Sequence, residues 1–139
     1  MAHKTGTRLN LFADNYVVFD LETTGLSPKA DEILEISGIR VREHKIQEEF
    51  STLVNPGRPI PPDATAVNGI TDGMVQTAPP PAAALEKFLE FADNDILVGH
   101  NIHTFDMPFL TLGAMKTLGK RVTNDYVDTL YLARNALPQ

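Results

Sequence analysis

An apolar strand that runs directly into two carboxylates constrains the fold of this chain more than any other feature. Residues 15–20, NYVVFD, join β-branched and aromatic side chains in one short run, which predicts a strand buried on both faces of a sheet. Asp20 ends the run and Glu22 follows two positions later. In an extended backbone, side chains two residues apart lie on the same face. Two neighbouring anions repel, so the sequence predicts a neutralising partner here: a divalent metal ion, an arginine or a shared proton.

The two segments that follow are predicted to form a hairpin. EILEISGIRVRE (residues 32–43) ends in alternating apolar and charged side chains, and KIQEEFSTLVN (residues 45–55) comes almost immediately after it. The junction at residues 43–45 is short enough for a hairpin, so we expect the two strands to be antiparallel neighbours. A second apolar strand, DILVGHN (residues 95–101), again ends in a polar cluster.

Apolar periodicity and capping residues predict the helices. One helix begins after Pro81, and another covers residues 105–119 with Pro108 in its first turn, where the missing N–H costs little. Their buried stripes are expected to be Leu85, Phe88, Leu89 and Phe91 with Ala92 in the first helix, and Phe105, Phe109, Leu112 and Met115 in the second. The proline-rich stretch 55–81 is expected to be an ordered connection that holds a short helix with Thr71 as its N-cap. Four of its apolar residues are expected to pack inward: Ile60, Val67, Ile70 and Met74.

The order of these segments predicts the fold class. A short strand to about Val127 precedes a last helix. Antiparallel strands come first and βα units follow, which favours an α/β sandwich with a mixed sheet of about five strands. We expect one domain over residues 15–139, preceded by a tail at residues 1–14.

The composition excludes several classes of protein. A net charge of −6 over 139 residues argues against a basic nucleic-acid coat, but not against an enzyme that reaches nucleic acid through metal ions. The absence of cysteine excludes disulfides, zinc–thiolate sites and thiol nucleophiles. No apolar run approaches the roughly 18 residues that span a bilayer, and the start carries no secretory segment. We therefore expect a cytoplasmic protein without a membrane partner.

A third acid, Asp106, is expected at the start of the helix that follows the second apolar strand. Alone it could be a helix cap, because helix N-termini favour negative charge. If the two apolar strands are adjacent and parallel, however, their carboxyl ends share one edge of the sheet, where ligands bind in open α/β folds. Asp20, Glu22 and Asp106 would then converge around one divalent metal ion, or two about 3.5–4 Å apart.

Several of these segments resemble the DEDD superfamily of 3′–5′ exonucleases, of the DEDDh type. The resemblance rests on VVFDLETTGL, DEILEISGIRV, FSTLVNPGRPIP, NGITDGMV and ILVGHNIHTFDMPFL, in that order. The nearest group is the proofreading exonuclease of bacterial DNA polymerase III, PolC-type or epsilon. The resemblance implies a ribonuclease H-like three-layer sandwich with helices on both faces, and two Mg²⁺ or Mn²⁺ ions. It also implies release of 5′-monophosphates from single-stranded or frayed DNA 3′ ends, with a polymerase subunit or a fused polymerase as partner.

The resemblance also assigns roles to individual residues. Asp20, Glu22 and Asp106 become the catalytic, metal-binding acids. The substrate-binding residues become Thr23, Thr24, Gly25 and Leu26 from the first motif, with His100, Asn101 and Phe105 from the second. Asp128 matches a family position as well, and we expect it to have a structural role where the last strand meets the last helix.

One departure from the family pattern concerns its third motif, a histidine followed five positions later by an aspartate. Nothing after Asp106 provides it, so no general base is found, and we expect a domain whose C-terminal part is missing. His103 is not an obvious substitute. A missing helix would leave an exposed apolar patch on the sheet and a tendency to associate. Two alternatives to a DNA exonuclease stay open: an RNA-directed exonuclease of the same superfamily, and a non-catalytic module that binds nucleic acid or a polymerase.

Overall fold

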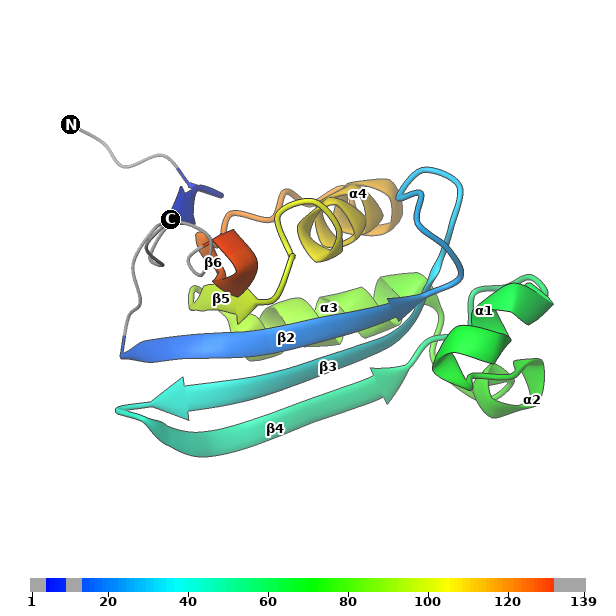
Figure 1. Ribbon diagram of the computed structural model, residues 1–139, viewed down its shortest axis with the longest axis horizontal. Helices are drawn as coiled ribbons and strands as arrows, with labels where there is room; N and C mark the ends of the chain where they lie inside the picture. Colours follow the sequence, from blue (N-terminus) through cyan, green and yellow to red (C-terminus); the bar gives the residue numbers. More distant parts are fainter. Residues whose placement is uncertain (1–4, 10–13, 132–139) are drawn as a thin grey trace, which may run out of the picture.

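The computed structural model describes residues 5–9 and 14–131, and these residues build a six-stranded mixed sheet with the order β1-β6-β5-β2-β3-β4 (Figure 1). Its strands are β1 (Arg8–Leu9), β2 (Asn15–Thr23), β3 (Ile33–Arg42), β4 (Lys45–Leu53), β5 (Ile96–Gly99) and β6 (Tyr126–Asp128). Its helices are α1 (Pro62–Asn68), α2 (Asp72–Val75), α3 (Pro81–Ala92) and α4 (Asp106–Leu118). No helix in this part of the chain is long and apolar enough to cross a membrane.

Strand pairing brings the two apolar strands of the sequence together. β2 pairs with β5 in parallel, with Val17 opposite Leu97, and β5 continues in parallel to β6. β2 pairs antiparallel with β3, and β3 with β4. Because β2 and β5 are parallel neighbours, their carboxyl ends lie at the same edge of the sheet, which is the condition that the sequence analysis set for the three acids to converge. The β3–β4 hairpin is also confirmed.

The main hydrophobic core lies between one face of the sheet and the helices α3 and α4 (Figure 1). β2 contributes Val17, Phe19 and Leu21, and alternate residues of a strand share a face. The apolar stripe expected on α3 is confirmed, since Leu85, Phe88, Phe91 and Ala92 are buried. On α4 the expected stripe is partly wrong: Phe109 is buried, but Met115 is half exposed, and Met107, Leu110 and Ala114 form the rest of the buried face. Apolar residues surround much of this helix, so periodicity alone did not select the packed side.

The opposite face of the sheet shows no broad exposed patch among the described residues. Val98 and Val127 are buried there, and Val18 and Ile39 are half buried. Only Ile46 is a strongly exposed large apolar residue on this face. The expected exposed patch is therefore not found in this part of the chain.

The proline-rich connection forms two short helices and a small second core. Thr71 caps α2, accepting a hydrogen bond from the Met74 N–H as expected. Ile60 and Ile70 are buried, whereas Val67 and Met74 are exposed, contrary to expectation. Val67 belongs to α1, which the sequence analysis missed, and the helix turns this side chain away from the small core formed by Leu34, Ile60, Ala64, Ile70 and Val75.

Two segments near the chain ends complete the sheet. Arg8 and Leu9 pair with β6 in parallel, so part of the expected tail at residues 1–14 belongs to the fold. Backbone pairing with the short strand β6 recruits this segment, which carries no alternating apolar pattern of its own. Residues 129–131 begin the helix expected after Val127, and the remainder of that expected helix lies outside the described residues.

Candidate active site

The first two acids lie at the carboxyl end of β2, on the face opposite the main core. Asp20 is exposed and Glu22 is half buried, and they alternate with Phe19 and Leu21, which face the core. Both acids therefore lie on one face of the sheet, as their spacing predicted. A fourth acid that the sequence analysis did not consider, Glu35 of β3, lies directly opposite Glu22.

The third acid reaches the same place from α4. Asp106 is the first residue of α4 and is only 4% exposed. Its Oδ2 accepts a hydrogen bond of 3.0 Å from the N–H of Leu21, the residue between Asp20 and Glu22. The helix has Phe105 at its N-cap position and no side-chain cap there. Asp106 therefore does not act as a helix cap: its carboxylate is fixed to β2, beside the other two acids.

Burial raises the pKa of all three carboxylates, and neighbouring charges add to the shift for Asp106 and Glu22. Burial raises the pKa of Asp106 to about 7; the hydrogen bond from Leu21 opposes this shift, and the charges of Asp20 and Glu22 add to it. Burial also raises the pKa of Asp20. For Glu22 the pKa is raised by burial first, and then by the charges of Asp20 and Glu35. The site is thus a concentrated negative charge that favours a bound proton or cation.

The described residues do not supply a basic partner for this charge. The ion pairs among them join Arg40, Arg42, His44 and Arg58 to other acids, and none involves Asp20, Glu22 or Asp106. The alternative in which an arginine neutralises the acids finds no support in this part of the chain.

The donor set fits a hard divalent cation, because carboxylate oxygens are the ligands that Mg²⁺ and Mn²⁺ prefer. Within the described ranges, however, no three histidine or acidic side chains are already arranged as a metal site. The repelling carboxylates are close enough to shift each other's pKa values but are not gathered around one point. The chemistry of the side chains therefore indicates metal binding, although the described side chains are not gathered into a metal site in this structure.

A groove of about 440 Å³ adjoins the acids. Residues 21–26 line one side of it, Val67 and Asn68 of α1 line the other, and Phe105 also contributes. Leu26 and Val67 are 84% and 88% exposed. Two bare apolar side chains at the mouth of a groove are suited to contact a planar, apolar group such as a nucleobase.

Five of the seven predicted substrate-binding residues line this groove: Thr23, Thr24, Gly25, Leu26 and Phe105. His100 and Asn101 do not. The His100 ring lies 3.1 Å from the hydroxyl of Thr129, and the Asn101 N–H donates to Asp128. These two residues instead form part of the loop that connects β5 to α4.

Two groove residues also shape their own loop. The Thr24 hydroxyl donates to Asp31 and accepts from the N–H of Glu32. A Cβ atom on Gly25 would lie 2.4 Å from the Asp31 carboxylate, so only glycine fits there. Thr24 and Gly25 thus build the turn that precedes Leu26.

The sequence analysis missed the opposite wall of the groove. Asn68 ties α1 to β2, since its side-chain amide donates to the Thr23 carbonyl at 3.2 Å and its Oδ1 accepts from the Ile70 N–H. The signals for this helix were present: Pro62 starts it, and Gly69 ends it with a φ of 75°.

The described histidines contact residues other than the three acids of the site. His103 is bonded through Nδ1 to the Tyr126 hydroxyl at 2.6 Å and stacks on that ring. His44 lies in the β3–β4 hairpin, at the other end of the sheet. None of the histidines at positions 44, 100 and 103 forms a hydrogen bond or an ion pair with Asp20, Glu22 or Asp106.

Parallel strands that end in acidic side chains, within a mixed sheet flanked by helices, define a ribonuclease H-like fold. A family model described as Exonuclease (RNase_T) matches residues 17–139, so the chain belongs to this exonuclease family. It is 42% identical over 130 residues to DNA polymerase III PolC-type of Oceanobacillus iheyensis, covering 94% of this chain and 9% of that protein. It is 46% identical over 121 residues to a DNA polymerase III subunit epsilon-like protein of Rhodobacter capsulatus, covering 85% and 17%.

The solved structures support the same fold. Exonuclease I of E. coli in complex with a dT13 oligonucleotide matches with a TM-score of 0.77 and 18% identity, over 89% of this chain and 30% of that chain. The apo form of exonuclease I matches with the same TM-score and covers 88% of this chain. The chain thus spans less than a fifth of the two curated relatives and under a third of these structures.

Proposed function

We propose that this chain is a metal-dependent 3′–5′ exonuclease domain of the proofreading type, which removes nucleotides as 5′-monophosphates from DNA 3′ ends. The observation that carries the proposal is the convergence of Asp20, Glu22 and Asp106 at one edge of the sheet, linked by the Leu21–Asp106 hydrogen bond. The PolC-type and epsilon-like relatives favour DNA as substrate and a fused or separate polymerase as partner.

In this proposal Asp20, Glu22 and Asp106 hold Mg²⁺ or Mn²⁺, and two ions complete the working site. When bound, a divalent ion activates water and stabilises the leaving oxygen of a phosphodiester. The bare side chains of Leu26 and Val67 receive the terminal nucleotide in the groove, together with Phe105. Single-stranded or frayed ends are favoured, because the last nucleotide must leave its stack to enter the groove.

A second candidate function is a non-catalytic module that binds nucleic-acid ends. The observation in its favour is that each described histidine contacts a residue other than the three acids. Such a module would use the same groove and acids to hold a metal-bound 3′ end without cleaving it.

The test is cleavage of a 5′-labelled single-stranded DNA oligonucleotide and of the matched RNA, each with Mn²⁺, with Mg²⁺ and with a chelator. We expect shortening of the DNA from its 3′ end that stops with chelator. Asp20→Asn should lower the rate at least about a hundredfold, because it removes a charged metal ligand. The matched control is Glu49→Gln, which removes an exposed acid from a neighbouring strand and should leave the rate unchanged.

The other outcomes each select a different function. Faster cleavage of RNA than of DNA would favour an RNA-directed exonuclease, in which contacts to the 2′-hydroxyl decide the substrate. Binding of the oligonucleotide without cleavage would favour the non-catalytic module. Equal activity of Asp20→Asn and the unaltered protein would refute the role of the acids.

A further inference from the structure

The loop between β5 and α4, residues 100–105, receives contacts from three side chains of β6 and the residue just after it. The Tyr126 hydroxyl binds the His103 ring at 2.6 Å, and the Thr129 hydroxyl lies 3.1 Å from the His100 ring. Between these two contacts, Asp128 binds the backbone of the same loop. One short segment therefore fixes the loop at three successive points.

Asp128 is the centre of this arrangement. It is only 3% exposed, and its carboxylate accepts four backbone hydrogen bonds. The donors are the N–H groups of Asn101 at 2.9 Å, His103 at 3.0 Å, Leu130 at 2.9 Å and Tyr131 at 3.4 Å. Burial alone would raise the pKa of Asp128, but these hydrogen bonds outweigh it and hold the pKa below its ordinary value. A buried carboxylate satisfied in this way is an ionised, rigid anchor.

The anchored loop determines where α4 begins. Asn101 adopts a φ of 58°, which is uncommon for a residue other than glycine, and the Met107 N–H closes the turn onto the Ile102 carbonyl at 2.7 Å. Because α4 has no side-chain cap, its first residue depends on this loop for its position. That residue is Asp106, whose Oδ2 receives the Leu21 N–H.

We propose that Asp128 is a positioning residue for the acid cluster: its carboxylate fixes loop 100–105, and the loop fixes Asp106 against β2. Asp128 does not contact the acids itself, and it belongs to no part of the groove. The inference rests on the proposed function only in treating Asp106 as part of the metal site. Residues behind a ligand often influence metal affinity strongly, because they set the orientation of the ligand.

The test uses Asp128→Asn, which keeps the side-chain shape. The amide oxygen can replace Oδ1, which accepts from Asn101, Leu130 and Tyr131, but the amide nitrogen replaces Oδ2 and opposes the His103 N–H. The readouts are hydrogen exchange of the His103 and Leu21 amides by NMR without metal, and Mn²⁺ affinity by calorimetry. We expect both amides to exchange about tenfold faster or more, and Mn²⁺ affinity to fall about tenfold or more.

The matched control is Asn124→Ala, at the opposite end of the same strand. Asn124 is 7% exposed and donates to the carbonyls of Asp93 and Asp95 at 2.9 and 2.8 Å. The Asn124→Ala variant should have a lower melting temperature, because these hydrogen bonds are lost. The exchange rate of the Leu21 amide and the Mn²⁺ affinity should stay unchanged. Asp128→Glu is the second variant in case the first does not fold; it keeps the charge but displaces it, so the Leu21 amide should again exchange faster.

Three outcomes separate the alternatives. Faster exchange at Leu21 together with weaker Mn²⁺ binding supports the proposal. Faster exchange at His103 with Leu21 unchanged overturns it, because Asp128 would then hold only its own loop. Faster exchange at Leu21 in a protein that binds no Mn²⁺ even when unaltered would leave the positioning role standing and would instead refute the proposed metal-dependent function.

Discussion

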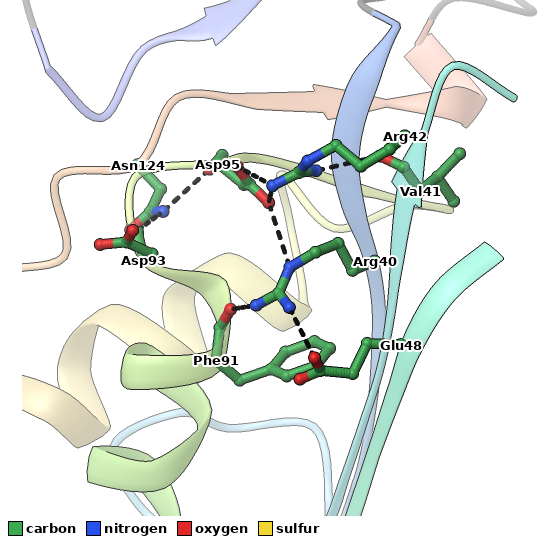
Figure 2. Close-up of polar contacts among 8 residues, drawn as sticks. All are labelled: Arg40, Val41, Arg42, Glu48, Phe91, Asp93, Asp95 and Asn124. Carbon is green, nitrogen blue, oxygen red and sulfur yellow. Dashed lines mark hydrogen bonds and ion pairs between the residues drawn. The ribbon is translucent and has the colours of Figure 1, made fainter. Parts of the chain in front are cut away.

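Charged side chains are ion-paired at one end of the sheet, whereas the three acids of the site at the other end form no ion pair within the part of the chain that the structure describes. At the end where β2 begins, Arg40 and Arg42 of β3 meet Asp95, which precedes β5 (Figure 2). Arg42 binds both Asp95 oxygens, at 2.9 and 2.7 Å, and Arg40 binds Glu48 of β4 at 3.0 Å. The Arg40 guanidinium also lies 4.5 Å from the centre of the Phe91 ring and donates to the Phe91 carbonyl. The two arginines are thus neutralised by acids of the same chain.

At the end where β2 finishes, three acids lie together without a basic partner among the described residues. Burial raises the pKa values of Asp20, Glu22 and Asp106, and the charges of Asp20 and Glu22 raise that of Asp106 further. None of the three forms an ion pair with a described residue. The strands thus carry arginines where β3 is joined to the turn before β5. Within the described ranges, they carry none beside the acids, where a ligand is expected. We infer that the ion pairs at one end stabilise the fold, whereas the unpaired acids at the other end destabilise it and are suited to bind a ligand.

Substitution of Asp106 is the most direct test of the difference between the two ends. Its pKa of about 7 in the folded protein exceeds the ordinary 3.8, so between these pH values the folded state binds more protons than the unfolded state. Stability from this group is therefore full below about pH 4 and is lost as the pH rises to about 7. Asp106→Asn removes this loss, so its free energy of unfolding without metal should exceed that of the unaltered protein by up to roughly 4 kcal/mol at pH 8.

Urea unfolding with a chelator at pH 4 and pH 8 measures this difference, which should nearly vanish at pH 4. Added Mn²⁺ should reverse it at pH 8, because the ion stabilises only the protein that binds it. Equal stability of the two proteins at pH 8 would show that burial and the neighbouring charges do not raise the pKa of Asp106. The proposed difference between the two ends of the sheet would then be wrong.

The paired end gives the next largest effect. Asp95→Ala leaves Arg40 and Arg42 without their shared partner, and the side chains of all three residues are largely buried, with exposures of 17%, 32% and 18% for Arg40, Arg42 and Asp95. The free energy of unfolding should fall by about 1–3 kcal/mol, between the values for exposed and buried pairs. Mn²⁺ affinity should stay the same, because the network lies at the far end of β5.

The control for this variant is Glu86→Gln, which removes an exposed acid of α3 and should change stability by less than about 0.5 kcal/mol. A folded Asp95→Ala protein with clearly weaker Mn²⁺ binding would contradict the independence of the two ends.

The sequence was sufficient where local patterns and topology agree. The apolar runs of β2 and β5 were recognisable as strands, and their parallel pairing brings the segments that carry Asp20 and Asp106 to one edge of the sheet. Thr71 was recognisable as a cap because its hydroxyl and its position before α2 are both local signals. These features depend on residues close in sequence, or on one rule about where parallel strands end.

The sequence was not sufficient where long-range contacts choose among equivalent patterns. α4 is apolar around much of its surface, so only packing against α3 and the sheet shows that Leu110 and Ala114 face inward while Met115 does not. Val67 looks like a core residue until Asn68 ties its helix to Thr23 and turns it toward the groove. The role of Asp128 likewise emerges only from four N–H groups that folding brings to one carboxylate.

The smallest effect is expected in the β3–β4 hairpin, at the paired end. Its two-residue turn, Glu43 and His44, has positive φ values of 49° and 68°, the conformation that asparagine and glycine adopt most easily. Replacing the pair by Asn-Gly should raise the free energy of unfolding by roughly 1 kcal/mol without changing Mn²⁺ affinity. The replacement also removes the exposed His44–Asp14 contact of 3.8 Å, so Asp14→Asn is the control and should change stability by only a few tenths of a kcal/mol. A loss of stability on introducing Asn-Gly would mean that contacts of Glu43 and His44 stabilise the turn. This end of the sheet would then depend on more than its ion pairs.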